Sequence, residues 1–311
     1  MPIIPNTKLD VFPICLGGNV FGWTADERAS FDVLDAYAEA GGNFIDTADT
    51  YSSWVPGHQG GESETILGRW LKARKNEGRI IIATKVGQAP GFKGLTAKNI
   101  RAAVEQSLAR LGIERIGLYY AHIDDQSVPL GETLGAFGTL VREGKVAHIA
   151  ASNYSAARLK EALDVSRRNG APSYVALQPH YNLLERAQYE QELAPLLARE
   201  KLVSFPYFAL AKGFLTGKYR PGRTVDSPRA QGASSYLDER GVALLAALDR
   251  IAEERSTTLA AVSLAWLLAK PTVAAPIASA RSVEQLRDIL PAATLKLSEQ
   301  ELATLDAITA P

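Results

Sequence analysis

The chain has 311 residues, of which 46% are hydrophobic and 22% are charged. These proportions are typical of a globular protein with a large buried core. Basic and acidic residues number 34 each, so the formal net charge is zero. This balance gives no support for nucleic acid or an anionic membrane as a partner. With one cysteine, Cys15, the chain cannot form an internal disulfide framework.

The sequence also lacks the signals of membrane insertion and secretion. No apolar run approaches the roughly 18 residues that a membrane-spanning helix needs. The amino terminus has no basic segment followed by an apolar one, which is the pattern of a secretory signal. We therefore expect a cytoplasmic protein without a membrane partner.

In the first half of the chain, short apolar runs alternate with stretches of helical periodicity. Residues 2–9 contain a turn signal and are predicted to form a small hairpin. Thr24 and Glu27 have the spacing of a capping box, which predicts a helix start, and Gly41-Gly42 predicts its end. We expect strands at 12–16, 43–46, 80–85 and 116–121, and helices around 66–71, 96–111 and 130–141.

The same alternation continues in the second half of the chain. Residues 212–236 form a polar, glycine-rich stretch without a regular pattern, which predicts a functional loop or lid. Capping boxes at Ser282/Gln285 and Ser298/Glu301 predict the starts of the last two helices. We expect strands at 146–152, 175–178, 202–206 and 273–277, and helices at 155–168, 193–202, 241–255 and 259–268.

Eight apolar strands alternating with helices predict an α/β fold with a parallel sheet. Eight such units in a chain of this length favour a closed (β/α)8 TIM barrel over an open sheet. We expect one domain over residues 1–311, with a short N-terminal hairpin and a C-terminal helix. The chain shows no linker or low-complexity tract that would divide it.

Three polar residues end successive predicted strands. Asp46, Lys85 and His122 each follow an apolar run, and Tyr51 lies five residues after Asp46. Active sites of parallel barrels are built at the carboxyl ends of the strands. The four residues are therefore predicted to meet at one rim. Taken singly, they have ordinary explanations, because Asp46 could cap a turn, Lys85 could extend its amine to solvent and His122 could be structural.

Several segments, in this order and spacing, resemble the aldo-keto reductase family, and the resemblance extends along nearly the whole chain. The similarity is closest to bacterial-type members and to potassium-channel beta subunits. The family implies an NADPH-dependent reductase of aldehydes or ketones on a (β/α)8 barrel. The segments are 44–51 (Phe-Ile-Asp-Thr-Ala-Asp-Thr-Tyr), 63–68, 83–85, 120–122, 144–146, 152–154, Gln178 with Tyr181-Asn182, and 213–219.

The chemistry of carbonyl reduction fits the four residues that match the family's catalytic positions. Negative charge develops on the carbonyl oxygen, so the site needs a proton donor and positive electrostatics. Tyr51 is predicted to be the general acid, with the ammonium of Lys85 lowering its pKa from about 10. Asp46 would keep Lys85 charged and oriented, and His122 would donate a hydrogen bond to the carbonyl oxygen.

The resemblance also implies where the cofactor NADPH/NADP⁺ binds. Ser152, Asn153 and Gln178 would hydrogen-bond the nicotinamide carboxamide, and Tyr207 would stack on the ring. The chain has no G-x-G-x-x-G motif, so a doubly wound dinucleotide fold has no support. The segment from Leu210 to Gly213, with Lys218 and Arg229, would wrap the pyrophosphate, and Ser279 to Arg281 with Gln285 and Asp288 would hold the adenosine end. The remaining residues implied for cofactor binding are Gly18, Asn19, Asp46, Phe208, Ala209, Leu210, Ala211 and Gly213.

Arg281 carries the preference for the phosphorylated cofactor. It lies beside a predicted helix start and could bind a 2′-phosphate by charge-assisted hydrogen bonds.

Two positions depart from the family. Phe208 replaces a serine whose hydroxyl is expected near the pyrophosphate, and Ile289 replaces an asparagine that contacts adenine, which predicts looser contacts at both points.

The predicted function is NADP(H)-dependent reduction of a small carbonyl compound, or the reverse oxidation of an alcohol. Two alternatives remain open from the residues: a cofactor-binding regulatory subunit with secondary turnover, and a barrel lyase that uses Lys85 as a Schiff base. Trp23, Trp54, His58 and the loop 212–236 are expected to shape substrate specificity. The sequence has no metal-ligand spacing, and it indicates no particular oligomeric state.

Overall fold

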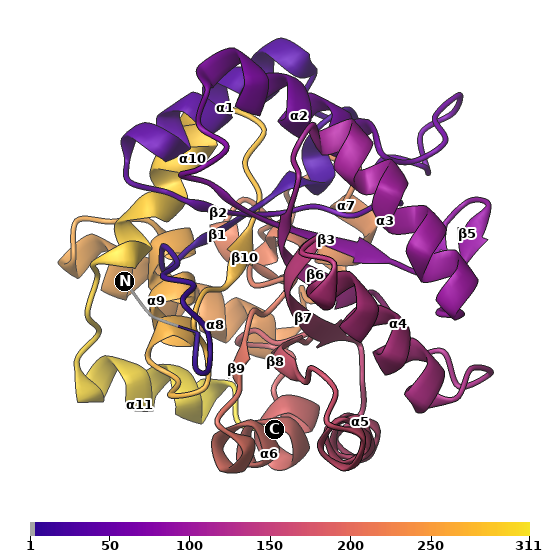
Figure 1. Cartoon of the computed structure of the whole chain (residues 1–311). Helices are drawn as coiled ribbons and strands as arrows, with labels where there is room; N and C mark the ends of the chain where they lie inside the picture. Colours follow the sequence, from indigo (N-terminus) through magenta and orange to yellow (C-terminus); the bar gives the residue numbers. More distant parts are fainter. Residues whose placement is uncertain (1–3) are drawn as a thin grey trace.

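The computed structural model describes residues 4–311, and its centre is an eight-stranded sheet (Figure 1). The strands follow the order β10-β1-β2-β3-β6-β7-β8-β9, and every neighbouring pair is parallel. Their bounds are β1 (Cys15–Gly17), β2 (Phe44–Asp46), β3 (Ile81–Val86), β6 (Ile116–Ala121), β7 (Val146–Ser152), β8 (Tyr174–Gln178), β9 (Val203–Ser204) and β10 (Ile277–Ala278).

The sheet closes on itself through the segment that precedes β10. Ser204 of β9 forms a parallel bridge with Val273. The Ser204 N–H donates to the Thr272 carbonyl at 2.7 Å, and the Ala274 N–H donates to the Ser204 carbonyl at 3.0 Å. On the other side, Cys15 of β1 pairs with Ile277 of β10. A ladder closed in this way is a barrel, so the predicted (β/α)8 fold is confirmed.

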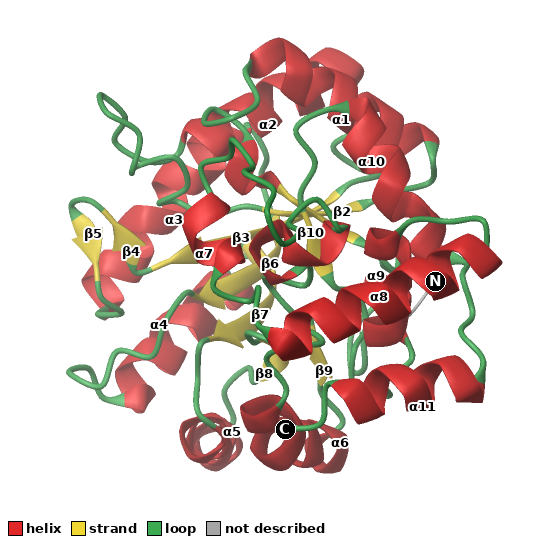
Figure 2. Cartoon of the chain, turned by 180° about the vertical axis from the view of Figure 1, so that it is seen from behind, coloured by secondary structure: helices red, strands yellow, loops and turns green. Residues whose placement is uncertain are grey.

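Helices surround the strands on the outside of the barrel, as Figure 2 shows from the opposite side. The short helix α7 crosses the end of the barrel that faces the reader in that view. The α-helices are α1 (Glu27–Glu39), α2 (Glu62–Arg74), α3 (Ala97–Leu111), α4 (Leu130–Arg142), α5 (Ala156–Asn169), α6 (Ala194–Glu200), α7 (Ala230–Ser234), α8 (Glu239–Glu254), α9 (Leu259–Leu268), α10 (Val283–Ile289) and α11 (Glu299–Ile308).

Alternation along the strands determines which polar side chains reach the barrel interior. Successive strand residues point to opposite faces. Phe44, Leu118 and Tyr120 pack in one buried cluster with Ala83, Ala150, Ala176 and Phe205, whereas Ile45 and Tyr119 pack in the other cluster, with residues of the helices. Two residues further along the same strands, the inward-facing positions are occupied by Asp46, Lys85, His122, Ser152 and Gln178. Five polar side chains are thereby placed at the carboxyl end of the barrel interior.

The N-terminal predictions are confirmed only in part. Pro2 and Ile3 of the predicted hairpin lie outside the described residues, and residues 4–9 form a turn in which the Ile4 N–H donates to the Leu9 carbonyl at 3.0 Å. The predicted Thr24 cap is wrong. Asp26 is the N-cap of α1, because its carboxylate accepts from the Ala29 N–H at 2.8 Å.

The second half of the chain departs from prediction at several segments. The predicted strand 273–277 is displaced, and β10 begins only at Ile277. The loop 212–236 contains regular structure after all, namely α7 and most of a 3-10 segment, Ala211–Thr216. The predicted helix 193–202 follows a π-helical turn at Tyr189–Leu193. A hairpin of β4 (Gln88–Ala89) and β5 (Phe92–Lys93) is an addition that the sequence pattern did not indicate.

The two C-terminal capping boxes behave differently. Ser298 and Glu301 form a complete box at the start of α11, as predicted. At α10 the Ser282 hydroxyl accepts from the Gln285 N–H, but the Gln285 side chain accepts from the N–H of Arg281 at 3.0 Å. Between residues 4 and 311, the structure contains no helix with the length and apolar run needed to cross a bilayer.

Candidate active site

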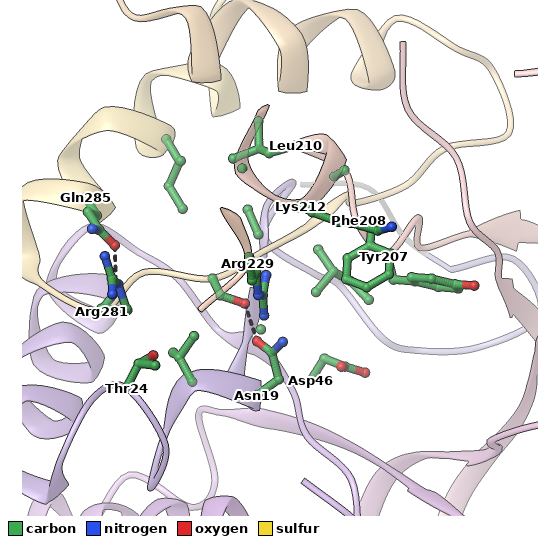
Figure 3. A pocket seen from close by; sticks show the side chains of 18 of the residues that line it. Asn19, Thr24, Asp46, Tyr207, Phe208, Leu210, Lys212, Arg229, Arg281 and Gln285 are labelled. Carbon is green, nitrogen blue, oxygen red and sulfur yellow. Dashed lines mark hydrogen bonds between the residues drawn. The ribbon is translucent and has the colours of Figure 1, made fainter. Parts of the chain in front are cut away.

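A pocket of about 620 Å³ opens at the carboxyl ends of the barrel strands. Figure 3 shows side chains from both halves of the chain converging on it. Residues of the β1, β2, β7 and β8 ends line it together with the segment after β9 and the region from β10 to α10. The sequence-predicted residues in its wall are Asn19, Asp46, Tyr51, His122, Ser152, Asn153, Gln178, Tyr207, Phe208, Ala209, Leu210, Gly213, Lys218, Arg229, Ser279, Arg281, Gln285 and Asp288.

Lys85 lies directly behind the pocket wall and is completely buried. Its Nζ atom donates to Asp46 Oδ2 at 2.7 Å, to the Thr47 carbonyl at 2.8 Å and to the Tyr51 hydroxyl at 2.7 Å. An ammonium group has three N–H donors. All three are used, so the geometry is that of a charged lysine fixed between a carboxylate and a phenol.

Asp46 joins three side chains that come from distant parts of the chain. Its Oδ2 atom accepts from Lys85 and also from the Tyr51 hydroxyl at 3.1 Å. Its Oδ1 atom accepts from the Nε2 atom of Gln178 at 2.9 Å. Since the carboxylate is 1% exposed, these bonds replace the water that it loses on burial.

The expected lowering of the Tyr51 pKa is wrong in its net direction. Burial raises the pKa of Tyr51 well above its ordinary value, and the Asp46 carboxylate beside it raises it further. Burial lowers the pKa of Lys85, although the attraction of Asp46 opposes that shift. Tyr51 is therefore a neutral phenol that retains its proton.

His122 completes the predicted group at the β6 end of the pocket. Its ring centroid lies 6.3 Å from that of Tyr51 in an edge-to-face arrangement. Burial lowers the pKa of His122 to about 3, and the nearby charge of Lys85 acts in the same direction. The imidazole is thus neutral at physiological pH, and within the described part of the chain its Nδ1 atom has no hydrogen-bond partner.

The predicted nicotinamide contacts form a connected group at the ends of β7, β8 and β9. The Tyr207 hydroxyl donates to Asn153 Oδ1 at 2.7 Å. Asn153 Nδ2 donates to the His122 carbonyl at 3.0 Å, and the Ser152 hydroxyl donates to the Gln178 carbonyl at 3.1 Å. His180, which the sequence did not single out, stacks on Tyr207 with centroids 5.3 Å apart and planes at 15°.

Three basic residues line the pocket between its middle and the end at Arg281. The guanidinium of Arg229 lies 5.7 Å from the ring centroid of Trp23, and its charge acts on Tyr51. Lys218, Arg229 and Arg281 all line the wall, and none of them has an ion pair with an acidic side chain among residues 4–311. Burial lowers the pKa of Lys218, and the charges of Arg281 and Arg229 add to that effect. Three unpaired cations around a cavity are suited to bind an anionic ligand.

Gly18, Ala211 and Lys85 are the predicted site residues that do not line the pocket. Gly18 lies behind the wall, where a Cβ atom would come within 3.0 Å of the Asp46 carbonyl and 2.9 Å of the Ser63 hydroxyl. Gly17 faces the cavity in its place. Ala211 is fully buried under the segment that it begins. Lys85 contacts two residues of the pocket wall, Tyr51 and Asp46, from behind.

Only some of the residues expected to shape substrate specificity line the pocket. Trp23 and Trp54 line the pocket, whereas His58 does not. Ile289, the departure at the adenine position, lies in the wall. Lys212, Thr216, Ser227 and Pro228 of the loop 212–236, which was also expected to shape specificity, lie in the wall. Wall residues that the sequence did not assign are Val20, Thr24, Thr258, Ala260, Ile277 and Ala278. Most are small or apolar and carry no motif that could reveal them.

Comparison with known proteins agrees with the fold and the pocket. The model of the aldo/keto reductase family matches residues 13–310. An uncharacterized oxidoreductase of Bacillus subtilis, YrpG, is 34% identical, with 97% of this chain and 94% of that protein covered. Norsolorinic acid reductase stcV of Emericella nidulans is 30% identical over 97% of this chain and 79% of its own length. The aryl-alcohol dehydrogenase [NADP(+)] of Phanerodontia chrysosporium is 29% identical, covering 98% and 84%.

A parallel barrel with polar side chains converging at its carboxyl rim defines a barrel enzyme. The chain belongs to the aldo/keto reductase family, because the family match covers nearly its whole length. Together with relatives named as reductases and dehydrogenases, this makes it an oxidoreductase of the carbonyl-reducing type.

Proposed function

We propose that the protein is an NADP(H)-dependent reductase of aldehydes or ketones, with Tyr51 as the general acid. The observation that carries this proposal is the contact of Tyr51 with Lys85 and Asp46 at the floor of the pocket. A phenol that faces a cavity while an ammonium group touches its oxygen is equipped to give up a proton to a bound substrate.

The pocket fits a dinucleotide cofactor in both shape and charge. It extends from Asp46 and His122 at one end to Arg281 and Gln285 at the other. Its unpaired cations, Lys218, Arg229 and Arg281, suit pyrophosphate and 2′-phosphate groups. The amides and hydroxyls near Gln178 and Ser152 suit a carboxamide. When bound, the reduced nicotinamide supplies the hydride.

The protein side of the reaction follows from the hydrogen bonds. Reduction at the carbonyl carbon would move the electron pair of the C=O bond to oxygen, and Tyr51 would transfer its proton to that oxygen. The raised pKa of Tyr51 keeps this proton available until substrate binds. The ammonium of Lys85 then stabilises the phenolate that remains, and solvent returns the proton. Neutral His122 donates a hydrogen bond to the same carbonyl oxygen.

Two observations support NADPH over NADH. Arg281 is a cation without an acidic partner in the described chain, at the end of the pocket remote from Tyr51, where a 2′-phosphate would lie. One of the matched relatives is named as an NADP(+) enzyme.

The same relative is named for aryl alcohols, and Trp54 packs edgewise on both Tyr51 and Trp23. We therefore propose aromatic carbonyl compounds as substrates.

The fixed state of Lys85 argues against the lyase alternative. A Schiff-base lysine needs a neutral amine that reaches the substrate. Here all three N–H groups of Lys85 are directed at protein oxygens, and the side chain is outside the pocket wall.

The direct test is to incubate the protein with NADPH deuterated at the transferable position and benzaldehyde. We expect benzyl alcohol that carries one deuterium on the alcohol carbon, together with NADP⁺. Absence of deuterated alcohol with benzaldehyde and with a panel of aliphatic aldehydes and ketones would contradict the proposal.

A further inference from the structure

The ring of Tyr207 in the pocket wall is stacked on the imidazole of His180. The two ring centroids lie 5.3 Å apart, and the ring planes make an angle of 15°, which is an offset-stacked arrangement that aromatic pairs favour. Tyr207 lines the pocket, whereas His180 does not. His180 therefore contacts the tyrosine ring from outside the pocket wall.

The backbone brings these two rings together. His180 and Tyr207 form a parallel bridge that continues the pairing of β8 with β9, and the Tyr207 N–H donates to the Pro179 carbonyl at 3.0 Å. His180 lies two residues after Gln178, and Tyr207 lies two residues after Phe205. Because strand residues alternate between faces, both rings continue the inward-facing positions of their strands at the carboxyl rim.

Phe208 adds a second aromatic contact to His180. Its ring meets the imidazole edge-on, with centroids 5.5 Å apart and planes at 75°, and it meets Tyr207 at 5.2 Å and 66° (Figure 3). Phe208 occupies the position where the family has a serine. The chain therefore lacks the hydroxyl expected near the pyrophosphate and has a ring in contact with both His180 and Tyr207 instead.

The buried side chain of Asn182 holds both neighbours of Tyr207. Its Nδ2 atom donates to the Phe208 carbonyl at 3.0 Å and lies 3.5 Å from the Nε2 atom of His180. The Ala211 N–H donates to the same carbonyl at 2.7 Å. Phe208 has a φ of 49°, in the left-handed region that is unfavourable for phenylalanine. Such strain persists only where the surroundings enforce it, so the three rings form a fixed group.

The imidazole of His180 is uncharged at physiological pH. Burial lowers the pKa of His180, and the charge of Lys212 acts in the same direction, whereas Glu185 opposes the shift. A neutral imidazole packs on the phenol as an aromatic ring. It also adds no positive charge beside the nicotinamide, which becomes cationic when NADPH is oxidised.

From these contacts we propose that His180 is a positioning residue for the nicotinamide end of the cofactor. It holds the plane of Tyr207, the ring on which the nicotinamide is expected to stack, while Phe208 packs against both. This role rests on the proposed binding of NADP(H), and His180 itself touches neither cofactor nor substrate. A ring that is already fixed loses little side-chain freedom on binding, so His180 strengthens the binding of the nicotinamide and its alignment with the substrate.

The test compares NADPH with adenosine 2′,5′-bisphosphate, which has the adenosine end of the cofactor but no nicotinamide. Both dissociation constants are measured by isothermal titration calorimetry. The energy of an aromatic pair predicts that His180→Ala raises the Kd for NADPH roughly 2- to 10-fold. The Kd for adenosine 2′,5′-bisphosphate should stay at the wild-type value. We also expect kcat to fall, because a loosely held nicotinamide is less often aligned with the substrate.

Three further variants show whether the flat ring is what matters. His180→Phe keeps a ring and should retain a Kd for NADPH near that of the wild-type protein. His180→Gln keeps a polar group near Asn182 but has no ring, so it should bind NADPH as weakly as His180→Ala. It provides the same test if the alanine variant does not fold. His148→Ala, in β7 and outside the pocket wall, is the control for the loss of a histidine and should leave both constants unchanged.

A double-mutant cycle shows whether His180 acts through Tyr207. In Tyr207→Ala the ring that His180 supports is missing. Adding His180→Ala to that variant should therefore raise the Kd for NADPH no further. A second rise as large as the one in the wild-type background would overturn the proposal.

The other outcomes separate this role from the proposed function. An equal rise in the Kd for NADPH and for adenosine 2′,5′-bisphosphate in His180→Ala, or no rise for either, would overturn the role of His180. So would a His180→Phe variant that binds NADPH as weakly as His180→Ala. A wild-type protein that binds NADPH but reduces no carbonyl compound would contradict the proposed function, while the binding constants would still decide the role of His180. A wild-type protein that binds no NADPH would overturn both.

Discussion

The Nζ atom of Lys85 lies 2.7 Å from the hydroxyl oxygen of Tyr51, and both groups contact the same oxygen of Asp46. These three groups have two opposite effects on the ionisation of Tyr51. Burial and the carboxylate keep the proton on the phenol, whereas the ammonium is placed to stabilise the phenolate once the proton has left. The residues therefore favour a tyrosine that holds its proton until it is transferred during reduction.

Removing Lys85 should cost stability as well as activity. In Lys85→Met, the Asp46 carboxylate remains buried without its counter-charge. Breaking a buried pair in this way typically lowers the free energy of unfolding by about 3–5 kcal/mol. Urea denaturation of the variant measures the loss.

The matched control is the double variant Asp46→Asn/Lys85→Met. It removes both charges, so we expect it to recover most of the lost free energy of unfolding while remaining inactive. A single variant that loses less than about 1 kcal/mol would contradict the buried charge pair.

Arg281 should distinguish the two nicotinamide cofactors. Loss of charge-assisted bonds to a 2′-phosphate predicts that Arg281→Ala raises the Kd for NADPH roughly 10- to 100-fold. The Kd for NADH should change little, because NADH has no such phosphate. Arg287→Ala, at an exposed arginine of α10, the helix that follows Arg281, should leave both constants unchanged. Equal weakening of NADPH and NADH would mean that Arg281 does not recognise the 2′-phosphate.

Asp49 predicts a specific dependence of stability on pH. Its carboxyl group is 2% exposed, and neither oxygen has a hydrogen-bond partner in the described chain. Burial raises the pKa of Asp49 to about 8, and the Glu64 carboxylate adds to the shift. Because the folded state binds this proton more tightly than the unfolded state, stability from Asp49 is full below about pH 4 and is lost as the pH rises toward 8.

The amide of Asp49→Asn does not ionise, so this variant should not lose free energy of unfolding at this position as the pH rises. The difference in free energy of unfolding between Asp49→Asn and the wild-type protein should grow by up to about 4 kcal/mol between pH 5 and pH 8. Asp32→Asn, at an exposed aspartate, controls for the loss of a surface charge. A difference that stays constant with pH would show that Asp49 is ionised throughout.

The barrel and the position of the catalytic group follow from local patterns in the sequence. Short apolar runs determine the strands. Because Phe44 and Tyr120 face the barrel interior, Asp46 and His122, two residues further along the chain, face it as well. Errors occur where strands are short. At β10 only two residues pair with β1, so the apolar run at 273–277 gives no signal of where pairing begins.

Features that depend on contacts between distant segments could not be predicted in this way. The bond from Gln178 to Asp46 joins residues 132 positions apart. The stacking of His180 on Tyr207 and the placement of Lys212 between two rings also require the folded arrangement. The direction of the Tyr51 pKa is a further example, because the sequence shows the neighbouring lysine but not the degree of burial.

The most direct test of the account is Tyr51→Phe, with kcat for an aromatic aldehyde and the Kd for NADPH measured on the same preparation. Loss of the general acid predicts that kcat falls roughly 100- to 10,000-fold while the Kd stays near that of the wild-type protein. Tyr119→Phe removes a buried hydroxyl that has no partner in the described chain and should leave both values unchanged. A Tyr51→Phe variant that turns over at nearly the wild-type rate would contradict the central claim that this phenol protonates the substrate.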